Sequence, residues 1–446
     1  MTLALRDLWV SMDDLAPADR VTARALLARP NLTNGKKVCK GTICIHYTTT
    51  GSDAVKKRDV SPHNGIPDYV DLTLKTVRHI HDVYINAGYR APLPDGGKSG
   101  SNALDVFLED DGAQGYYGYC APDQNTPQGV YTSWSYCSFD NDFSPTQFPT
   151  NTPRENLQVT AAHEYFHATQ FAYDAYEDHW ILEATATWAE DELYPDVNDN
   201  LQYLPDGPIG RPEAPLDLFE SCCHQYGTWI FFRYLTEEFP TERGALPELI
   251  LQLWKRLDSK GSAPDDYSMQ GVENVLASHG TDIAHELGVF AVANRFPALA
   301  YAEGSLYPTA NAAVVDVSGS SLDPATFSKT LKHLSTSTVR YEPDGLTEAN
   351  WNLDLAFDLA PTAQGSAAVI ATETPGQVNY QIVSLDANGD ADVAVPFSSQ
   401  NVTAVEVTLV NAGTAYDCWN GGNFSCQGTS LSDGLVQQVN PLAYQG

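Results

Sequence analysis

Apolar residues recur at helical spacing through most of the chain and alternate at strand spacing in its last third. The helical pattern predicts helices at residues 13–27, 65–87, 155–176, 228–239, 246–257, 272–277 and 283–294. Alternating or continuous apolar runs predict strands at residues 42–48, 104–108, 129–139, 352–359, 367–372, 377–385, 392–396 and 403–411. The fold class is therefore α+β.

The pattern changes near residue 330, where helix formers give way to Val, Thr, Ser, Gly and Asn. We expect a helical lobe with a small antiparallel or mixed sheet at residues 56–330 and a C-terminal β-sandwich at residues 331–446. Residues 1–55 form an N-terminal segment, which is either the remnant of a pro-segment or simply the start of the fold.

A metal-binding pattern lies inside residues 161–192. His163, Glu164 and His167 have the form H-E-x-x-H. On a helix, residues four apart share a face, so both imidazoles can bind one metal ion, with Glu164 beside it as a general base. A catalytic zinc takes three protein ligands and keeps one position open, so a third donor is expected nearby. Glu183 and Glu190 are the downstream candidates.

The residues around Glu183 resemble a known family. Residues 180–186, WILEATA, resemble the W-x-x-E-G-x-A segment of the gluzincins, the zinc metallopeptidases whose third ligand is a Glu on a second helix. The resemblance implies a zincin-like metallopeptidase domain in which His163, His167 and Glu183 hold one catalytic zinc. The residues around both motifs are most similar to the sequences of a group of secreted bacterial metalloproteases. This similarity extends from about residue 60 to 240.

Two departures from the gluzincin pattern affect the fold. His167 and Glu183 are a little closer in sequence than in the best-known members, and Leu-Glu-Ala replaces the Asn-Glu-Gly core of the second motif. The turn between the two helices must therefore be tight.

Three further residues are candidates around this site. Glu190 lies two helical turns beyond Glu183, which suits a carboxylate that holds a zinc-bound His through its other ring nitrogen. The Tyr-Gly before the apolar helix at 228–239 resembles the position of a gluzincin oxyanion-stabilising residue, so Tyr226 ranks ahead of His224. Packing at a helix start is the equally weighted alternative for both residues.

Composition narrows the class of partner. The formal charge is −32, from 57 acidic and 25 basic residues, which argues against nucleic acid and anionic membrane partners. No run of about 18 apolar residues exists, so membrane insertion is not expected. A protein or peptide substrate is the expected partner, and the oligomeric state stays open.

Eight cysteines fall in close sets, which predicts disulfides and an oxidising, extracellular location. The sets are Cys39 with Cys44, Cys120 with Cys137, Cys222 with Cys223, and Cys418 with Cys426. Residues 1–10 do not read as a signal peptide, so a secreted protein would have lost its signal before this sequence begins.

Acidic clusters at residues 109–111, 140–142 and 190–199 could hold a structural Ca²⁺ near the active site, or they could be solvated surface. Residues 386–392 resemble a calcium loop, but Asn388-Gly389 favours a hairpin turn.

The sequence thus predicts a secreted zinc-dependent endopeptidase. Two alternatives stay open: a zinc hydrolase acting on a non-peptide substrate, and a non-catalytic binding protein with a structural zinc and a C-terminal binding module. Glu164 favours catalysis, because a structural zinc has no need of a base.

Overall fold

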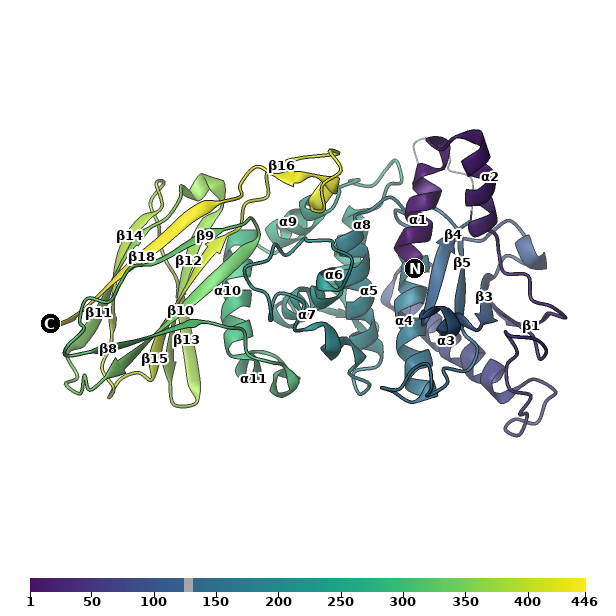
Figure 1. The fold of residues 1–446 in the computed structure, drawn as a ribbon, viewed down its shortest axis with the longest axis horizontal. Helices are drawn as coiled ribbons and strands as arrows, with labels where there is room; N and C mark the ends of the chain where they lie inside the picture. The colour runs from purple at the N-terminus through teal and green to yellow at the C-terminus, as the bar shows by residue number, and fades with distance from the viewer. Residues whose placement is uncertain (124–130) are drawn as a thin grey trace. The chain divides into compact units, whose positions relative to one another are not determined.

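The computed structural model describes residues 1–123 and 131–446 (Figure 1). Contacts within the chain group Met1–Asn200 with Glu238–Tyr267 as a first unit, and Leu201–Glu237 with Ser268–Gly446 as a second. The first unit therefore contains both the N-terminal segment and the H-E-x-x-H residues. The domain boundaries expected after residues 55 and 330 stay predictions, because such a unit need not end where a domain does.

The sheet of the first unit has the strand order β1-β2-β3-β5-β4. Its strands are β1 Lys36–Lys40, β2 Ile43–Tyr47, β3 Leu104–Glu109, β4 Gly118–Pro122 and β5 Ser135–Asp140. The three central strands are parallel, and each outer strand is antiparallel to its neighbour. All six residues of β5 are buried, as expected for a strand covered on both faces.

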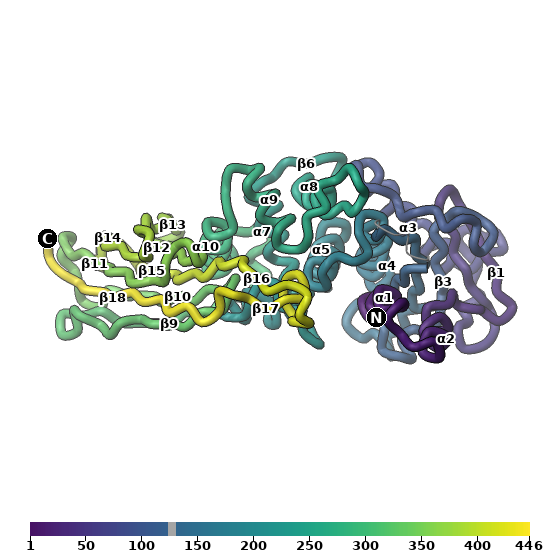
Figure 2. Tube along the Cα trace, turned by 90° about the horizontal axis from the view of Figure 1, so that it is seen from above, coloured from purple at the N-terminus to yellow at the C-terminus, as the bar shows by residue number. Residues whose placement is uncertain are grey.

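Helices with clear start and stop signals pack beside this sheet. The helices of the first unit are α1 Thr2–Val10, α2 Pro17–Leu26, α3 Asp68–Ala87, α4 Pro153–Gln170, α5 His179–Leu193 and α8 Glu248–Arg256. Pro67 precedes α3, and Gly88 ends it at a φ of 87°, which an L side chain rarely adopts. Helix α4 packs against strands β4 and β5 (Figure 1) and against helices α3 and α5 (Figure 2). Gly118 allows the close approach of β4, because a Cβ there would lie 2.9 Å from Thr160 of α4.

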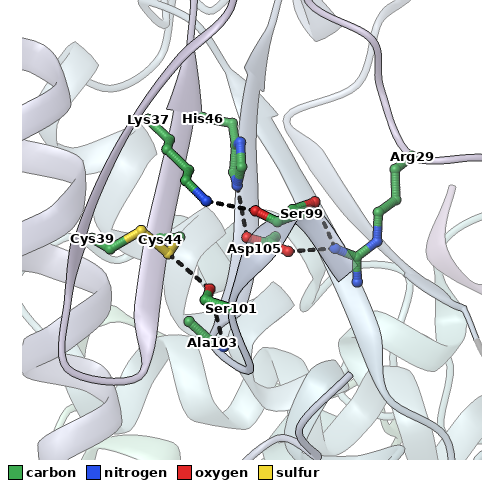
Figure 3. Close-up of a disulfide and its surroundings, with 9 residues drawn as sticks. All are labelled: Arg29, Lys37, Cys39, Cys44, His46, Ser99, Ser101, Ala103 and Asp105. Carbon is green, nitrogen blue, oxygen red and sulfur yellow. Dashed lines mark hydrogen bonds and ion pairs between the residues drawn. A yellow bond between two sulfur atoms is a disulfide. The ribbon is translucent and has the colours of Figure 1, made fainter. Parts of the chain in front are cut away.

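A disulfide closes the turn between β1 and β2, where Cys39 and Cys44 are bonded (Figure 3). Beside it, Asp105 of β3 accepts a hydrogen bond from His46 at 2.7 Å and pairs with Arg29. Arg29 also pairs with Asp95 and Asp123, both at 2.7 Å. One half-buried guanidinium therefore ties the segment after α2 to β3 and to the end of β4.

The second unit combines helices with two larger sheets. Its helices are α6 His224–Gly227, α7 Trp229–Glu238, whose last residue falls in the first unit, α9 Met269–Ser278, α10 Ile283–Arg295 and α11 Pro297–Ala300. One sheet has the order β13-β12-β15-β10-β8 and the other β14-β11-β18-β9. The strands are β8 Ala313–Ser318, β9 Phe327–Leu331, β10 Ser335–Asp344, β11 Trp351–Asp358, β12 Ser366–Thr374, β13 Gln377–Ile382, β14 Asp390–Pro396, β15 Ala404–Asn411 and β18 Leu435–Gln445.

The two sheets share one apolar core, to which Leu355 of β11, Val407 of β15 and Val439 of β18 contribute. Helix α10 lies against the outer face of the five-stranded sheet, where Val292 contacts Val369 and Ala371. The molecule is thus a mixed α+β protein with several sheets and a strand-rich C-terminal part, as expected at that level. The remaining sheets are two-stranded: β6 Glu242–Arg243 with β7 Leu246–Pro247, and β16 Tyr416–Asp417 with β17 Thr429–Ser430.

Several local expectations were confirmed and others were wrong. Helix α3 and the strands near 104, 352, 367 and 404 lie within a few residues of their predicted bounds. The helix expected at 13–27 is shorter, and a separate helix, α1, precedes it. The Asn388-Gly389 turn joins strands of different sheets, so the expected hairpin was wrong.

The strand expected at 129–139 begins at Ser135 and is interior, so β4 rather than β5 ends the described sheet. Residues 129 and 130 of that prediction lie outside the described residues.

All four cysteine sets are bonded as the close spacing suggested, and the described residues leave no free cysteine. Across the described ranges, no helix has both the length and the apolar character needed to cross a bilayer.

Candidate metal centre

Local sequence fixes the start of α4, and with it the position of the two histidines. Thr152 caps the helix by accepting a hydrogen bond from the Glu155 amide at 3.3 Å, and the Glu155 carboxylate accepts one from the Thr152 amide at 2.8 Å. This reciprocal capping box, with Pro153 in the first turn, sets the first residue of the helix. His163 and His167 then lie one turn apart near its C-terminal end.

Helix α5 brings Glu183 to the two histidines. The atoms His163 Nε2 and His167 Nε2 lie 3.1 Å apart, and Glu183 Oε2 lies 3.1 Å from the first and 3.5 Å from the second. For bonds of about 2.0–2.1 Å and tetrahedral angles, the ligand atoms of zinc lie about 3.3 Å from one another. The three donors predicted from the sequence therefore have the spacing of a single metal ion's ligands, and the described residues contain no other such cluster.

The outer nitrogen of each imidazole has its own acceptor. Glu190 Oε1 lies 2.7 Å from His163 Nδ1, as predicted from the spacing of α5. Gln170 Oε1 lies 2.7 Å from His167 Nδ1, and the amide nitrogen of Gln170 donates to the Leu182 carbonyl at 2.9 Å. Gln170 was not predicted, although a side chain three residues after His167 on one helix can reach it.

Glu190 and Gln170 determine which ring nitrogen of each histidine has a lone pair for a metal. An Nδ1 that donates to Glu190 or Gln170 carries a hydrogen, so in neutral imidazole the Nε2 does not. Two such lone pairs and a carboxylate oxygen within 3.5 Å of one another repel unless a positive charge lies between them. The arrangement therefore fits a cation, or in its absence a proton on one ring.

The pKa shifts of His163, Glu183 and Glu190 agree with the need for a positive charge at this site. Burial lowers the pKa of His163, but its hydrogen bonds to Glu183 and Glu190 outweigh burial and hold the pKa well above 6.5. Burial raises the pKa of Glu183, yet the two histidines overcome it and the pKa falls far below 4.5. Burial raises the pKa of Glu190 to about 7, although its bond with His163 opposes the rise. Without a metal, the site keeps a proton on His163.

Glu164, the predicted base, follows the first histidine and is only 7% exposed. Its Oε2 accepts a hydrogen bond from the Thr2 hydroxyl at 2.8 Å. Nothing in the local sequence around Thr2 or Glu164 indicates this contact, because 162 positions separate them.

His224 and Tyr226, the predicted oxyanion residues, belong to the second unit, and their surroundings are described within it. His224 is buried, and burial lowers the pKa of its ring despite the 2.8 Å contact of Nδ1 with the Asp206 carbonyl. Tyr226 is half-buried and stacks on Tyr203, with ring centroids 5.1 Å apart. Their role at the metal centre stays a prediction.

The acidic clusters considered for calcium are occupied by local hydrogen bonds. Asp140 accepts from the amides of Gly112, Asp142 and Phe143 at 2.5–3.0 Å, and Asp110 caps the short helix after β3. Asp111 is buried against the Ser138 hydroxyl, and burial raises its pKa to about 8. Whether any of the acidic clusters binds calcium stays a prediction.

Comparison with known proteins does not identify the chain. No protein-family model matches it, and no curated protein does. Among solved structures, the pre-peptidase C-terminal domain of a collagenase from Bacillus anthracis matches 31% of this chain and 100% of that chain, with 13% identity and a TM-score of 0.18.

A family GH115 4-O-methyl-alpha-glucuronidase with specificity for decorated arabinogalactans matches 81% of this chain and 54% of that chain, with 7% identity and a TM-score of 0.17. Both TM-scores are too low to carry an argument about fold or function. The function is therefore argued from the site alone.

Proposed function

We propose that this protein is a secreted zinc-dependent endopeptidase whose metal ligands are His163, His167 and Glu183. The observation that carries the proposal is the spacing of the three donor atoms, 3.1–3.5 Å, with Glu164 next to the first of them in sequence. Three protein ligands leave one tetrahedral position open, as catalytic zinc sites do, whereas structural sites close all four.

The donor set also favours zinc among common metals. Two imidazoles and one carboxylate are nitrogen and oxygen ligands of the kind zinc binds in hydrolases, while calcium and magnesium prefer oxygen alone. Glu190 and Gln170 hold the two rings in the tautomer that presents Nε2 inward. When bound, zinc supplies Lewis-acid polarisation of a carbonyl oxygen and a water of lowered pKa.

Each residue proposed for the site has its own role in peptide hydrolysis. Glu164 accepts the proton of the attacking water and passes it to the leaving amine. Glu183 and Glu190 place negative charge around His163. This charge strengthens the binding of a metal ion by the Nε2 lone pair of His163. Tyr226 and His224 are the candidates to hold the carbonyl oxygen as its charge develops. The four disulfides are consistent with a protein that works outside the cell.

A substrate screen tests this proposal. Purified protein and its Glu164→Gln variant are assayed on casein, on short blocked peptides and on simple esters, before and after a zinc chelator. Cleavage of casein by the wild type alone, lost on chelation and restored by zinc, is the expected result. Hydrolysis of esters without any peptide cleavage would move the assignment to a zinc hydrolase of another class.

A further inference from the structure

The N-terminal helix α1 contacts the base of the proposed peptidase. The Thr2 hydroxyl donates to Glu164 Oε2 at 2.8 Å and accepts a hydrogen bond from the Cys120 amide at 2.9 Å. Thr2 is 2% exposed, so water does not compete for either bond. One hydroxyl therefore takes an acceptor position on Oε2, one of the two oxygens with which Glu164 would accept a proton from water.

The second partner of Thr2 lies on the free side of strand β4. Among the described residues, β4 ends the sheet, with β5 as its single neighbour. Cys120 faces Cys137 of β5 and is bonded to it, and the Cys120 amide hydrogen bonds to Thr2 rather than to a strand. Thr2 thus bridges an outer backbone donor of the sheet and the carboxylate next to the metal ligands. A free outer strand is where an extended peptide can add itself by main-chain hydrogen bonds.

Helix α1 is held there by the loop that joins α4 to α5. Arg6 is buried and donates to the carbonyls of Ala175, at 2.7 Å, and Glu177. The Trp9 ring packs edge-on against Tyr176, with centroids 5.5 Å apart. Figure 1 shows α1 beside β4, the strand that it contacts. The contacts bury one face of the helix against the elements that carry the metal ligands.

We propose that α1, residues Thr2–Val10, is an internal inhibitor of the metal centre. This inference rests on the proposed peptidase function. While α1 is docked, Thr2 holds Glu164 and the helix lies across the approach from β4, so a peptide cannot reach the base. The turn that follows α1 is exposed at Ser11, Asp13 and Asp14, so cutting the chain there would free the helix without breaking the sheet.

The test uses the full chain with a recognition sequence for a site-specific protease inserted in the turn after α1. The folded protein is assayed before and after cutting and removal of the released peptide. We expect kcat/KM on casein to rise at least tenfold on cutting, and a synthetic peptide of residues 1–10 to inhibit the cut protein. The same peptide with Thr2→Val is expected to inhibit less well, because Val has the shape of Thr without the hydroxyl.

A variant of the uncut protein supplies a second measurement. Arg6→Ala removes the bonds to the loop and is expected to raise activity, whereas Arg24→Ala, on the exposed face of α2, is the matched control and is expected to change nothing. Binding of a small zinc-directed hydroxamate, followed by calorimetry, reports access to the metal without requiring turnover. Circular dichroism confirms that each protein stays folded.

The outcomes separate the inhibitor from the peptidase. Equal casein cleavage before and after cutting would overturn the inhibitory role and leave the peptidase intact. No cleavage by either form, with hydroxamate bound more tightly after cutting, would keep the occlusion by α1 and reject the peptidase. No cleavage and equal hydroxamate binding would reject both.

Discussion

Replacing Glu190 by Gln measures how far the outer carboxylate supports the metal centre. The Glu190 side chain is 8% exposed, and its Oε1 lies 2.7 Å from His163 Nδ1. Gln keeps the length and an acceptor oxygen but loses the charge. The substitution therefore changes one physical quantity, the negative charge behind the ligand His163.

The size of the effect follows from the two kinds of hydrogen bond. A bond to a charged group contributes about 1.5–3 kcal/mol and a neutral one about 0.5–1.5 kcal/mol, so the loss is about 1–1.5 kcal/mol. Since about 1.4 kcal/mol corresponds to a factor of ten, the zinc Kd should rise about tenfold, at the lower end of what outer-sphere substitutions cost. Glu190→Leu, which removes the acceptor altogether, should cost more.

The assay is a zinc titration against a competing chelator at pH 8, where Glu190, with its pKa of about 7, is ionised. Asp19→Asn removes the same charge from the exposed surface of another helix, α2, and is expected to leave the Kd unchanged. If the folded Glu190→Gln variant has a zinc Kd within twofold of the wild-type value, the charge of Glu190 does not support the metal centre.

Five further predictions concern the first unit. Glu164→Gln should lower kcat on peptides by about 10²–10⁴-fold while keeping one zinc per chain, and a variant that stayed active would exclude Glu164 as the base. Gln170→Leu leaves the His167 Nδ1–H and the Leu182 carbonyl without their partner, so urea unfolding should show a loss of about 1–3 kcal/mol for each, together with weaker zinc binding; unchanged stability would contradict the pairing. Because zinc must displace a proton from His163, whose pKa in the metal-free site lies well above 6.5, the apparent zinc affinity should fall by up to tenfold per pH unit below that pKa, with proton release measurable by calorimetry in two buffers. In the metal-free protein the same group stabilises the fold fully below about pH 6.5, and this contribution is lost as pH rises through the folded pKa; a metal-free protein whose stability rose over that range would count against it. Asp111→Asn should raise the free energy of unfolding at pH 9 by about 5 kcal/mol and leave it nearly unchanged near pH 4, because burial raises the pKa of Asp111 from 3.8 to about 8 and the charged form is disfavoured in the fold; destabilisation in calcium-containing buffer would instead point to an ion at this carboxylate.

Sequence predicted those parts of the site whose geometry is local. The histidines of α4 follow from helical spacing, and Glu190 follows from its distance along α5 from Glu183. The bounds of α3 follow from Pro67 and Gly88, which act on the backbone directly. In each case the relevant partners lie on one helix or at its ends.

What the sequence could not supply depends on contacts between distant segments. Whether β4 or β5 ends the sheet is decided by strand order, which no local pattern contains. Strand β10 was missed because polar residues stand between its core residues Val339 and Tyr341 and on the face away from the core, where the hydroxyl of Thr338 pairs with that of Thr408 across the sheet at 2.8 Å. A pattern of apolar residues does not register such a pair.

The contact between Thr2 and Glu164 joins two segments 162 positions apart, so it likewise could not be predicted from the sequence. Only the fold brings Thr2 of α1 to Glu164 of α4. The inhibitory role of α1 is therefore inferred from the structure and not from the sequence.

The proposed function requires that one zinc ion is held by His163, His167 and Glu183. The most direct measurement is a crystal structure of the zinc-loaded protein with diffraction data collected on both sides of the zinc absorption edge. We expect a single strong anomalous peak within bonding distance, about 2.0–2.2 Å, of the two Nε2 atoms and a Glu183 oxygen. A folded, zinc-loaded protein with no peak there, or with its peak at other residues, would contradict it.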